Sequence, residues 1–467
     1  MSEWWIGKKK WKLEEKQIAG TEYFYYFDKG KKFVDDKIIV DDSTLFMLLD
    51  GVIFNKLELL KKANQESWES TLIDLYKKNG LDFIKVLRGS FNGVIVDKVL
   101  KETIVFVDQL GERAVFYNID SDGFFVSTNF NRLIEYFREK EVSYSIDKEA
   151  IKNLLYFGYM IDHKTCVKEI KRIFPGNYLY KTSSQMEEKS YFRFSNKDLL
   201  QKTDEELIEL IDKTFRTAIK RELDKDKEYG YHSLIDISGG MDARTISFVA
   251  KAMGYGEITN LCYSQMNAYE RKIAEKLVKQ LGNNYIFKAL DNAEFIYKVD
   301  DLVKENFGLC YFAGITGGRD FLKILDKTYF GIEHTGILGD VYEGSFNEQP
   351  ILGKATVDEK YRVSRLLRID IDQECVKEYE NDELFKFYTR GILAGMSTHL
   401  IRQNYIETYS PFADIDFLNL MFAIPLEQRV TGKIYMKWLN KKYPEALENT
   451  YAGIMCKPNS GRIKIKL

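Results

Sequence analysis

The sequence lacks the usual marks of several protein classes. Its five cysteines lie far apart, are odd in number and form no C-x-x-C pair, which argues against a disulfide framework and a zinc site. Only four histidines occur, widely spaced, so a histidine-based transition-metal centre is not expected. No run of about 18 apolar residues appears, and the opening "MSEWWIGKKKWK" has no apolar core of signal-peptide length. These absences predict a cytoplasmic protein with reduced thiols and no membrane partner.

An excess of charge of one sign is also missing. The 69 basic and 71 acidic side chains give a formal net charge of -2, so no overall field recruits nucleic acid or an anionic membrane. With 45% hydrophobic and 14% aromatic residues, the 467-residue chain can fill more than one core. We therefore expect a globular protein of two or three domains.

The two parts of the chain differ in character. Residues 1–195 contain short aromatic and β-branched runs such as "EYFYYFD" and "FNGVIVD", with one helix near Ser67 to Gly80, which predicts packed antiparallel sheet. Residues 196–467 alternate strands such as "HSLIDIS" and "ITNLCYS" with helices, which predicts a parallel sheet. The polar segment from Ser183 to Asp198 is the expected boundary. The fold class is therefore α/β, with packed antiparallel sheet preceding a parallel α/β domain.

A glycine-rich turn follows the first strand of the later part. The order strand, S-G-G-x-D, helix places Ser238 to Asp242 at the carboxyl edge of a parallel sheet, where ligands usually bind. Gly239 and Gly240 can take backbone angles closed to other residues and can bring main-chain N–H groups close to an anion. The helix start adds positive charge, and Asp242 can hold a Mg²⁺-bound pyrophosphate. The alternative is a tight turn with Asp242 as the N-cap. A Walker loop is absent.

This turn resembles the pyrophosphate loop, S-G-G-x-D-S, of the asparagine synthetase and β-lactam synthetase superfamily. "TGILGDVYEGS" is similar to the second metal-binding turn of that family, with Asp340 at the position of its aspartate. "YIETYSPFADIDF" resembles the segment G-V-E-x-R-x-P-F-L-D and contains Glu407. "TGKIYMK" resembles G-K-x-x-L-R and places Lys433 at the active-site lysine. Four motifs in this order are more specific than any one of them.

The resemblance implies a fold and a reaction. It implies an Ntn-type antiparallel β-sandwich in residues 1–195 and, in residues 196–467, a PP-loop domain of the adenine nucleotide alpha hydrolase type that binds ATP and Mg²⁺. A carboxylate of a small molecule or peptide would be adenylated and then attacked by ammonia or an amine, with release of AMP and pyrophosphate. Whether the protein forms a homodimer is left open.

The same resemblance implies a set of site residues. The nucleotide-binding residues are Ser238, Gly239, Gly240, Asp242 and Gly339, the metal ligands are Asp242 and Asp340, and the catalytic residues are Lys433 and Glu407. Arg244, which departs from the family pattern, is added as a third catalytic candidate because of its charge. Three of these residues also have a simpler alternative. Lys433 can be a solvated lysine in a turn, and Asp340 can be a turn-capping residue. Glu407 can equally be a buried member of an ion pair.

The chain departs from the family pattern around these motifs. The family loop continues with Ser or Thr, whereas this chain has Ala243 and Arg244, whose guanidinium can supply charge to a phosphate or substrate. Val341 follows Asp340, where the synthetases have Glu. These changes leave the identity of the substrate open.

A proton acceptor is also missing from its expected place. Three residues before the aspartate, asparagine synthetases have a glutamate and β-lactam synthetases a tyrosine, but this chain has Ile337. Because isoleucine cannot carry a proton, either the base lies elsewhere or the amine arrives unprotonated. The candidate bases are Glu407, His334 and Glu343.

The first part resembles a glutamine-hydrolysing domain that has lost its chemistry. "LDGVIFN" and "LRGSFNGVIVD" carry the resemblance, which covers most of residues 45–135. Ser2 stands at the place of the family's nucleophilic cysteine, Asp50 replaces the oxyanion-hole asparagine, and the H-R-G-P-D clamp is absent. We expect no glutamine hydrolysis. The alternatives for the whole chain are an ammonia-using ligase, a dedicated cyclase or amide ligase of the β-lactam synthetase or lasso peptide type, and a nucleotide-binding pseudoenzyme acting as an interaction module.

Overall fold

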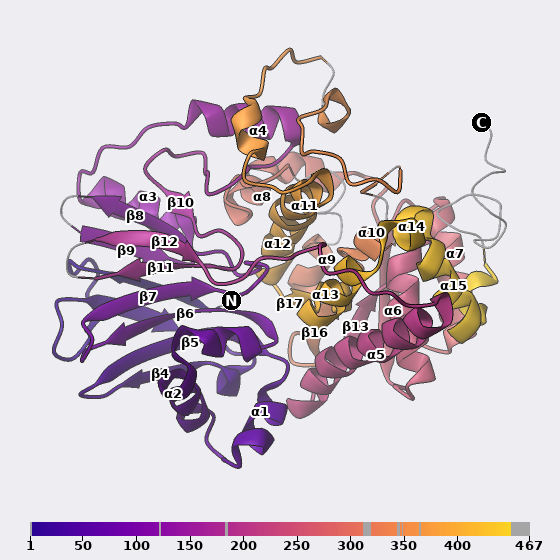
Figure 1. Ribbon diagram of the computed structural model, residues 1–467, viewed down its shortest axis with the longest axis horizontal. Coiled ribbons are helices and arrows are strands. Elements are labelled where there is room, and N and C mark those ends of the chain that lie inside the picture. The colour runs from indigo at the N-terminus through magenta and orange to yellow at the C-terminus, as the bar shows by residue number, and fades with distance from the viewer. Residues whose placement is uncertain are drawn as a thin grey trace.

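The computed structural model describes residues 2–120, 123–182, 185–311, 319–342, 346–347, 349–363 and 366–449. Two antiparallel sheets lie at one end of the molecule and a parallel sheet at the other (Figure 1). The expected mixture of antiparallel and parallel sheet is thus confirmed.

The first part of the chain forms two stacked six-stranded sheets. In spatial order, the first sheet contains β10 (Lys171–Arg172), β8 (Phe116–Asp120), β9 (Gly123–Ser127), β1 (Glu3–Gly7), β3 (Phe24–Asp28) and β2 (Lys16–Gln17). The second contains β12 (Met186–Ser190), β11 (Asn177–Lys181), β7 (Glu102–Val107), β6 (Gly89–Asp97), β5 (Leu45–Ile53) and β4 (Ile38–Asp41). The expected boundary segment therefore includes a strand, because β12 pairs antiparallel with β11.

The alternation of side chains along the strands explains how the sheets stack. Trp4 of β1 belongs to the core between the sheets, whereas its neighbour Trp5 faces the helices outside. On the outer face of the first sheet lie α3 (Phe130–Glu139) and α4 (Lys148–Phe157). On that of the second lie α1 (Lys56–Ala63) and α2 (Trp68–Asn79), the latter being the helix expected near Ser67.

A five-stranded parallel sheet organises the later part. Its spatial order is β15 (Asn284–Ala289), β14 (Ile258–Ser264), β13 (His232–Asp236), β16 (Phe330–His334) and β17 (Glu407–Tyr409). β13 is the first strand of this sheet in the sequence and lies at its centre. β14 and β15 follow on one side of β13, and β16 and β17 lie on the other side. The switch point between β13 and β16 is where open α/β sheets bind ligands.

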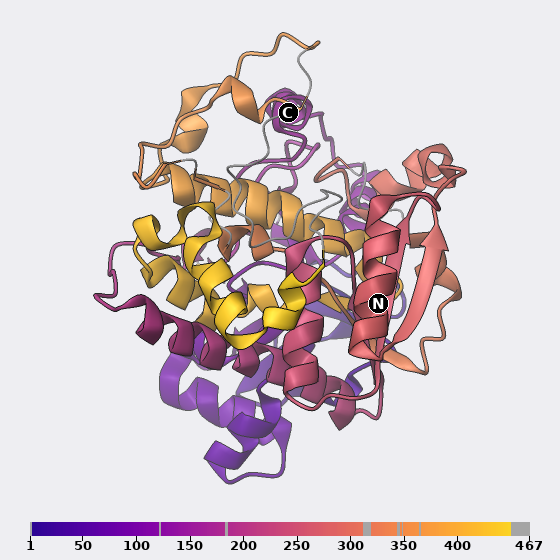
Figure 2. The same ribbon diagram turned by 90° about the vertical axis from the view of Figure 1, so that its right-hand side faces the viewer.

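Helices cover both faces of the parallel sheet (Figure 2). The larger core is built by α5 (Asp204–Glu228), α6 (Met241–Ala252), α7 (Tyr269–Leu281), α13 (Ile415–Ala423) and α15 (Lys433–Lys442), with α14 (Leu426–Arg429) beside α15. Towards the other face lie α8 (Val299–Glu305), α9 (Arg319–Ile324) and α12 (His399–Gln403). The short helices α10 (Gly339–Tyr342) and α11 (Asp382–Lys386) precede a π-helical segment at Phe387–Gly395. No helix in the described ranges combines the length and apolarity needed to cross a membrane.

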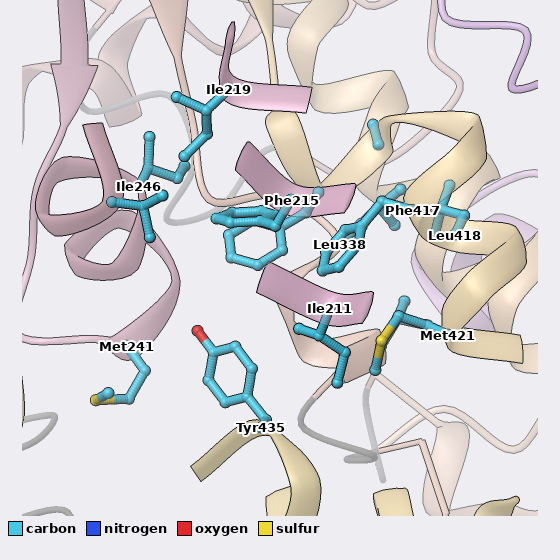
Figure 3. Close-up of a cluster of buried hydrophobic side chains, with 14 of the residues drawn as sticks. Ile211, Phe215, Ile219, Met241, Ile246, Leu338, Phe417, Leu418, Met421 and Tyr435 are labelled. Atoms are coloured by element: carbon cyan, nitrogen blue, oxygen red, sulfur yellow. The ribbon is translucent and has the colours of Figure 1, made fainter. Parts of the chain in front are cut away.

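Phe215 of α5 lies at the centre of this larger core (Figure 3). Its ring centroid is 4.7 Å from that of Phe412, 4.8 Å from that of Phe417 and 5.4 Å from that of Trp438. The side chain is fully buried. Four aromatic rings therefore pack where α5 meets the C-terminal helices.

We predict that Phe215→Ala lowers the free energy of unfolding by about 3–5 kcal/mol, because it removes buried surface and leaves a cavity. Urea denaturation followed by circular dichroism measures the change. Lys213→Ala, an exposed substitution on the same helix, is the control and should change it by less than about 0.5 kcal/mol. Equal effects of the two substitutions would contradict this description of the core.

Candidate active site

Two turns from neighbouring parallel strands line one cavity of about 440 Å³. The turn after β13 contributes Ser238, Gly240 and Asp242, and the turn after β16 contributes Asp340. Both turns leave the carboxyl ends of their strands at the switch point of the sheet. The sequence-predicted acidic pair thus shares one cavity.

Two glycines allow the turns to touch. A Cβ atom added at Gly339 would lie 2.0 Å from Asp242 Cγ, and one added at Gly336 would lie 2.8 Å from Asp242 Cβ. No side chain fits in either place without displacing Asp242 or the turn. Gly339 therefore packs behind the Asp242 side chain and is not among the cavity-lining residues, whereas Asp340 is.

The turn after β16 holds a strained residue. Leu338 has a φ of 69°, in the left-handed region that costs a residue with a Cβ atom about 1–2 kcal/mol. The adjacent carbonyl of Ile337 accepts a hydrogen bond of 2.7 Å from Ser410 Oγ, just after β17. This bond fixes the turn, and the side chains of Ile337 and Leu338 line the cavity.

The glycine-rich turn differs in one respect from the sequence-based expectation. Gly240 has a φ of -70° and a ψ of 167°, angles that other residues also adopt. Its function is spatial, because an added Cβ would lie 3.2 Å from Ser238 Oγ, which accepts the Gly240 N–H at 3.1 Å. Gly240 is the N-cap of α6 and Asp242 lies in its first turn, so the N-cap alternative for Asp242 is wrong. The positive end of α6 borders the cavity.

The wall of the cavity also contains polar groups that sequence analysis missed. Arg402 of α12 binds the Glu333 carboxylate and lies 3.6 Å from Asp236. Burial, reinforced by the neighbouring Glu333, raises the pKa of Asp236. His399 Nε2 lies 2.9 Å from Thr335 Oγ1, and burial with the nearby Arg402 lowers the pKa of His399 to about 3. This wall thus carries a neutral imidazole and a paired guanidinium.

Arg244 does not line the cavity. Its buried guanidinium donates to the Gly239 carbonyl at 3.0 Å and to the Ala446 carbonyl at 2.9 Å. These bonds tie the back of the glycine-rich turn to the segment after α15. The structure therefore places Arg244 as a support for the turn.

Lys433 is also outside the cavity lining. It is the first residue of α15, its side chain is exposed, and its Nζ donates to the Glu427 carbonyl at 3.1 Å. The described structure therefore does not bring Lys433 to Asp242 and Asp340, and its geometry matches the alternative of a lysine in an exposed turn.

Glu407 forms a buried ion pair between the two parts of the chain. It accepts hydrogen bonds from Arg113, which lies just before β8, and, at 2.6 Å, from Tyr409 Oη. Burial alone would raise its pKa, but the Arg113 guanidinium and the Lys37 ammonium hold the pKa at about 2. Glu407 does not line the cavity, so the structure matches the ion-pair alternative.

The remaining candidate bases do not reach the cavity in the described structure. His334 is buried between Glu222, 2.7 Å from Nδ1, and Asp226, 3.0 Å from Nε2. Burial opposes its protonation, yet the two carboxylates raise its pKa to about 9, so it is an imidazolium at neutral pH. Glu343 lies outside the described residues. Neither Glu407 nor His334 therefore lines the cavity.

A second, smaller cavity of about 170 Å³ lies between the two parts of the chain. It is lined by Ser2, Asp50, Asn92 and Arg113. The cavity thus brings together Ser2 and Asp50, the two residues that the sequence analysis compared with the glutaminase residues of the family. Ser2 Oγ accepts a 3.4 Å hydrogen bond from Arg113 Nη1, and Asp50 Oδ2 lies 3.8 Å from the same nitrogen. Asp50 and Ser2 thus share Arg113 as a neighbour in this cavity.

We predict that Glu407→Gln destabilises the protein by about 3–5 kcal/mol, because it removes the closest carboxylate partner of the buried Arg113 and leaves only the more distant Asp50. In the folded protein the pKa of Glu407 is about 2, below the usual 4.5. The ionised Glu407 therefore stabilises the fold fully above pH 4.5, and this stabilisation is lost as the pH falls toward 2. Chemical denaturation at several pH values should show the variant and wild type converging in this window. The exposed Glu66→Gln is the control, and a constant difference down to low pH would contradict the ion pair.

Comparisons with known proteins agree with this architecture. Residues 36–192 match the family described as a glutamine amidotransferase domain. A putative glutamine-hydrolysing asparagine synthetase 2 of Methanocaldococcus jannaschii is 25% identical over 296 residues, covering 60% of this chain and 56% of the relative. Asparagine synthetase 1 of Bacillus subtilis, also named as glutamine-hydrolysing, is 22% identical over 272 residues, which cover 56% of this chain and 42% of the relative.

An amidase is also similar to part of the chain. The amidase chyE of Penicillium rubens is 27% identical over 190 residues, which cover 40% of this chain and 27% of the relative. The chain thus spans about half or less of the length of these relatives. It is a protein related to the asparagine synthetases.

Proposed function

We propose that the protein is an ATP-dependent ligase of the asparagine synthetase type. It adenylates a substrate carboxylate, forms an amide with ammonia or an amine, and releases AMP and pyrophosphate without hydrolysing glutamine. The observation that carries this proposal is the shared cavity of Asp242 and Asp340 at the switch point of the parallel sheet. Its volume of about 440 Å³ falls within the usual range for small-molecule sites.

The cavity offers a place for each part of the first half-reaction. The phosphates of ATP lie against the N-terminus of α6, whose positive end favours an anion. A carboxylate oxygen of the substrate attacks the α-phosphorus, and the bond to the bridging oxygen of the β-phosphate breaks. Pyrophosphate leaves with that oxygen. The Ser238 to Asp242 turn orients the leaving group.

The residues present fit a Mg²⁺ ion. Mg²⁺ binds hard oxygen ligands and is commonly held by one or two carboxylates together with substrate phosphates. Asp242 and Asp340 would hold it together with the substrate phosphates. The ion would neutralise charge on the pyrophosphate leaving group.

The second half-reaction needs a nitrogen nucleophile that does not come from glutamine hydrolysis. Asp50 beside Ser2 supports the proposal that the first part does not hydrolyse glutamine. Ile337 lines the active cavity and supplies no proton acceptor, which favours a dedicated amide ligase or cyclase over asparagine synthesis itself. The amine attacks the acyl carbon, the bond from that carbon to the AMP oxygen breaks, and AMP leaves.

A second candidate is a nucleotide-binding pseudoenzyme that acts as an interaction module. One observation favours it, namely that Lys433, Glu407 and Arg244 all lie outside the lining of the cavity. The two candidates differ in one measurable product. A pseudoenzyme binds ATP but never releases pyrophosphate, whatever carboxylate is offered.

We predict that Asp242→Asn lowers carboxylate-dependent exchange of labelled pyrophosphate into ATP by at least about 100-fold, because a neutral amide no longer supports the leaving group. Asp300→Asn, an exposed substitution, is the matched control and should leave exchange unchanged. Full exchange in Asp242→Asn would remove this residue from the mechanism. ATP binding without exchange for any carboxylate in the wild type would establish the pseudoenzyme instead.

We further predict that Ser2→Ala leaves amide formation unchanged with every nitrogen donor, because the proposed reaction does not take its nucleophile from glutamine hydrolysis. Amide product is measured by mass spectrometry with ammonia, simple amines and glutamine as donors. Selective loss of a glutamine-supported reaction in the variant would identify Ser2 as a nucleophile and contradict this part of the proposal.

A further inference from the structure

Arg390 is an accessible cation in the wall of the active cavity. Two of the described residues that line this cavity carry a guanidinium, Arg390 and Arg402. Arg402 is buried and bound to the Glu333 carboxylate. The side chain of Arg390 is exposed, and within the described ranges it donates no hydrogen bond and forms no ion pair. Its N–H groups are therefore open to a ligand.

The ring of Phe346 shows where the guanidinium lies. Cζ of Arg390 stands over this ring, 5.4 Å from its centroid, and both residues belong to the cavity lining. The Phe346 carbonyl accepts a hydrogen bond of 2.7 Å from Lys386 Nζ, four residues before Arg390 in the chain. The ring is thus anchored to the same run of helix. The cation–π contact keeps the guanidinium at the cavity and leaves its hydrogen-bonding capacity to a ligand.

The backbone around Arg390 has an unusual conformation. Arg390 belongs to the π-helical segment Phe387–Gly395. Such helical turns are rare and are frequently found at functional sites. Thr389 and Gly391, on either side of Arg390, are buried, so packing holds the backbone at the point where the exposed side chain leaves it.

The π-helical segment packs against the turn that contains Asp340. A Cβ atom added at Gly391 would lie 3.2 Å from Leu338 Cδ2 and 3.6 Å from Phe346 Cε2. Leu338 precedes Asp340 by two residues, and all of these residues line the cavity. Arg390 therefore belongs to the side of the cavity formed by the turn after β16.

The charges in the cavity favour a phosphate group as the ligand of Arg390. Asp242 and Asp340 are the proposed ligands of Mg²⁺, and two carboxylates already balance the charge of that ion. The negative charge of the phosphates is then left to the positive end of α6, which is equivalent to roughly half an elementary charge, and to a cationic side chain. Lys433 cannot be that side chain in this structure, because its Nζ binds the Glu427 carbonyl outside the cavity lining.

We propose that Arg390 binds the pyrophosphate part of ATP and stabilises it as the leaving group. This inference rests on the proposed function. When the bond from the α-phosphorus to the bridging oxygen breaks, that oxygen keeps the electron pair, and the negative charge of the pyrophosphate increases. A guanidinium suits this charge because its paired N–H groups match phosphate oxygens. Arg390 thus supplies, from a different element, the positive charge that the family motif assigns to Lys433.

Isothermal titration calorimetry with magnesium present identifies the phosphates that Arg390 contacts. The probes are inorganic pyrophosphate, ATP and AMP, since AMP lacks the β- and γ-phosphates. We expect Arg390→Gln to raise the Kd for pyrophosphate and ATP by about 10-fold or more and that for AMP by less than about 2-fold. Arg390→Lys keeps the charge but loses the planar fork, so its effect should be intermediate. Arg138→Gln, an exposed substitution outside the cavity, is the matched control and should bind all three probes as wild type does.

The outcomes separate this inference from the proposed function. Unchanged pyrophosphate binding in Arg390→Gln would overturn the inference, and the proposed function would stand if the wild type exchanges pyrophosphate. An equal loss of AMP binding would also overturn it, because it indicates a general disturbance of the cavity. Weaker pyrophosphate binding in Arg390→Gln, with no exchange in the wild type for any carboxylate, would support Arg390 as a phosphate-binding residue and refute only the ligase reaction. A wild type that binds none of the three probes would overturn both.

Steady-state kinetics of pyrophosphate exchange distinguish a phosphate ligand from a carboxylate ligand. With the carboxylate that supports exchange in the wild type, Arg390→Gln should raise KM for pyrophosphate and ATP by about 10-fold or more and leave KM for the carboxylate within about 2-fold. A raised KM for the carboxylate alone would place the substrate acid at Arg390 and overturn the inference.

Discussion

The candidate site depends on one close contact, that between the turn after β16 and the first turn of α6. Gly336 and Gly339 permit it, since any side chain there would overlap Asp242. The order of strands makes the contact available, because β13 and β16 are neighbours in the sheet although far apart in the chain. Without this approach, Asp242 and Asp340 would lie on two separate loops instead of lining a single cavity.

The first part of the chain supports this contact from a distance. Arg113 binds Glu407 and Tyr409 on β17, and Ser410, the next residue, holds the Ile337 carbonyl of the turn. Hydrogen bonds thus connect the two stacked sheets of the first part with the cavity that contains Asp242 and Asp340. We infer that the sandwich stabilises the site even if it performs no chemistry of its own.

Several features of the fold and site follow directly from the sequence. An apolar run followed by glycines and an aspartate predicted the first strand of the parallel sheet and the turn of Asp242 at its carboxyl edge, whereas the turn of Asp340 was predicted from the family resemblance of residues 335–345. Asp242 and Asp340 therefore share a cavity as expected. The positions of these two residues depend on where their strands end, and the sequence pattern of strands and turns predicts those ends.

Other residues could not be placed in this way, because the direction of a side chain depends on distant partners. Arg244 and Lys433 lie in the expected segments, but their charged groups bind carbonyl oxygens outside the cavity. Glu407 faces Arg113, which is 294 residues away in the chain. His399 carries no motif, and only the fold brings α12 to Thr335. Two charged residues in otherwise apolar strands, Asp236 and Glu333, were the available signal for this polar wall.

The most direct test of the central claim is a crystal structure with magnesium and a non-hydrolysable ATP analogue. We predict one magnesium ion between the carboxylates of Asp242 and Asp340, with the phosphates at the N-terminus of α6. A nucleotide bound elsewhere, or a metal ion that contacts neither carboxylate, would contradict the account.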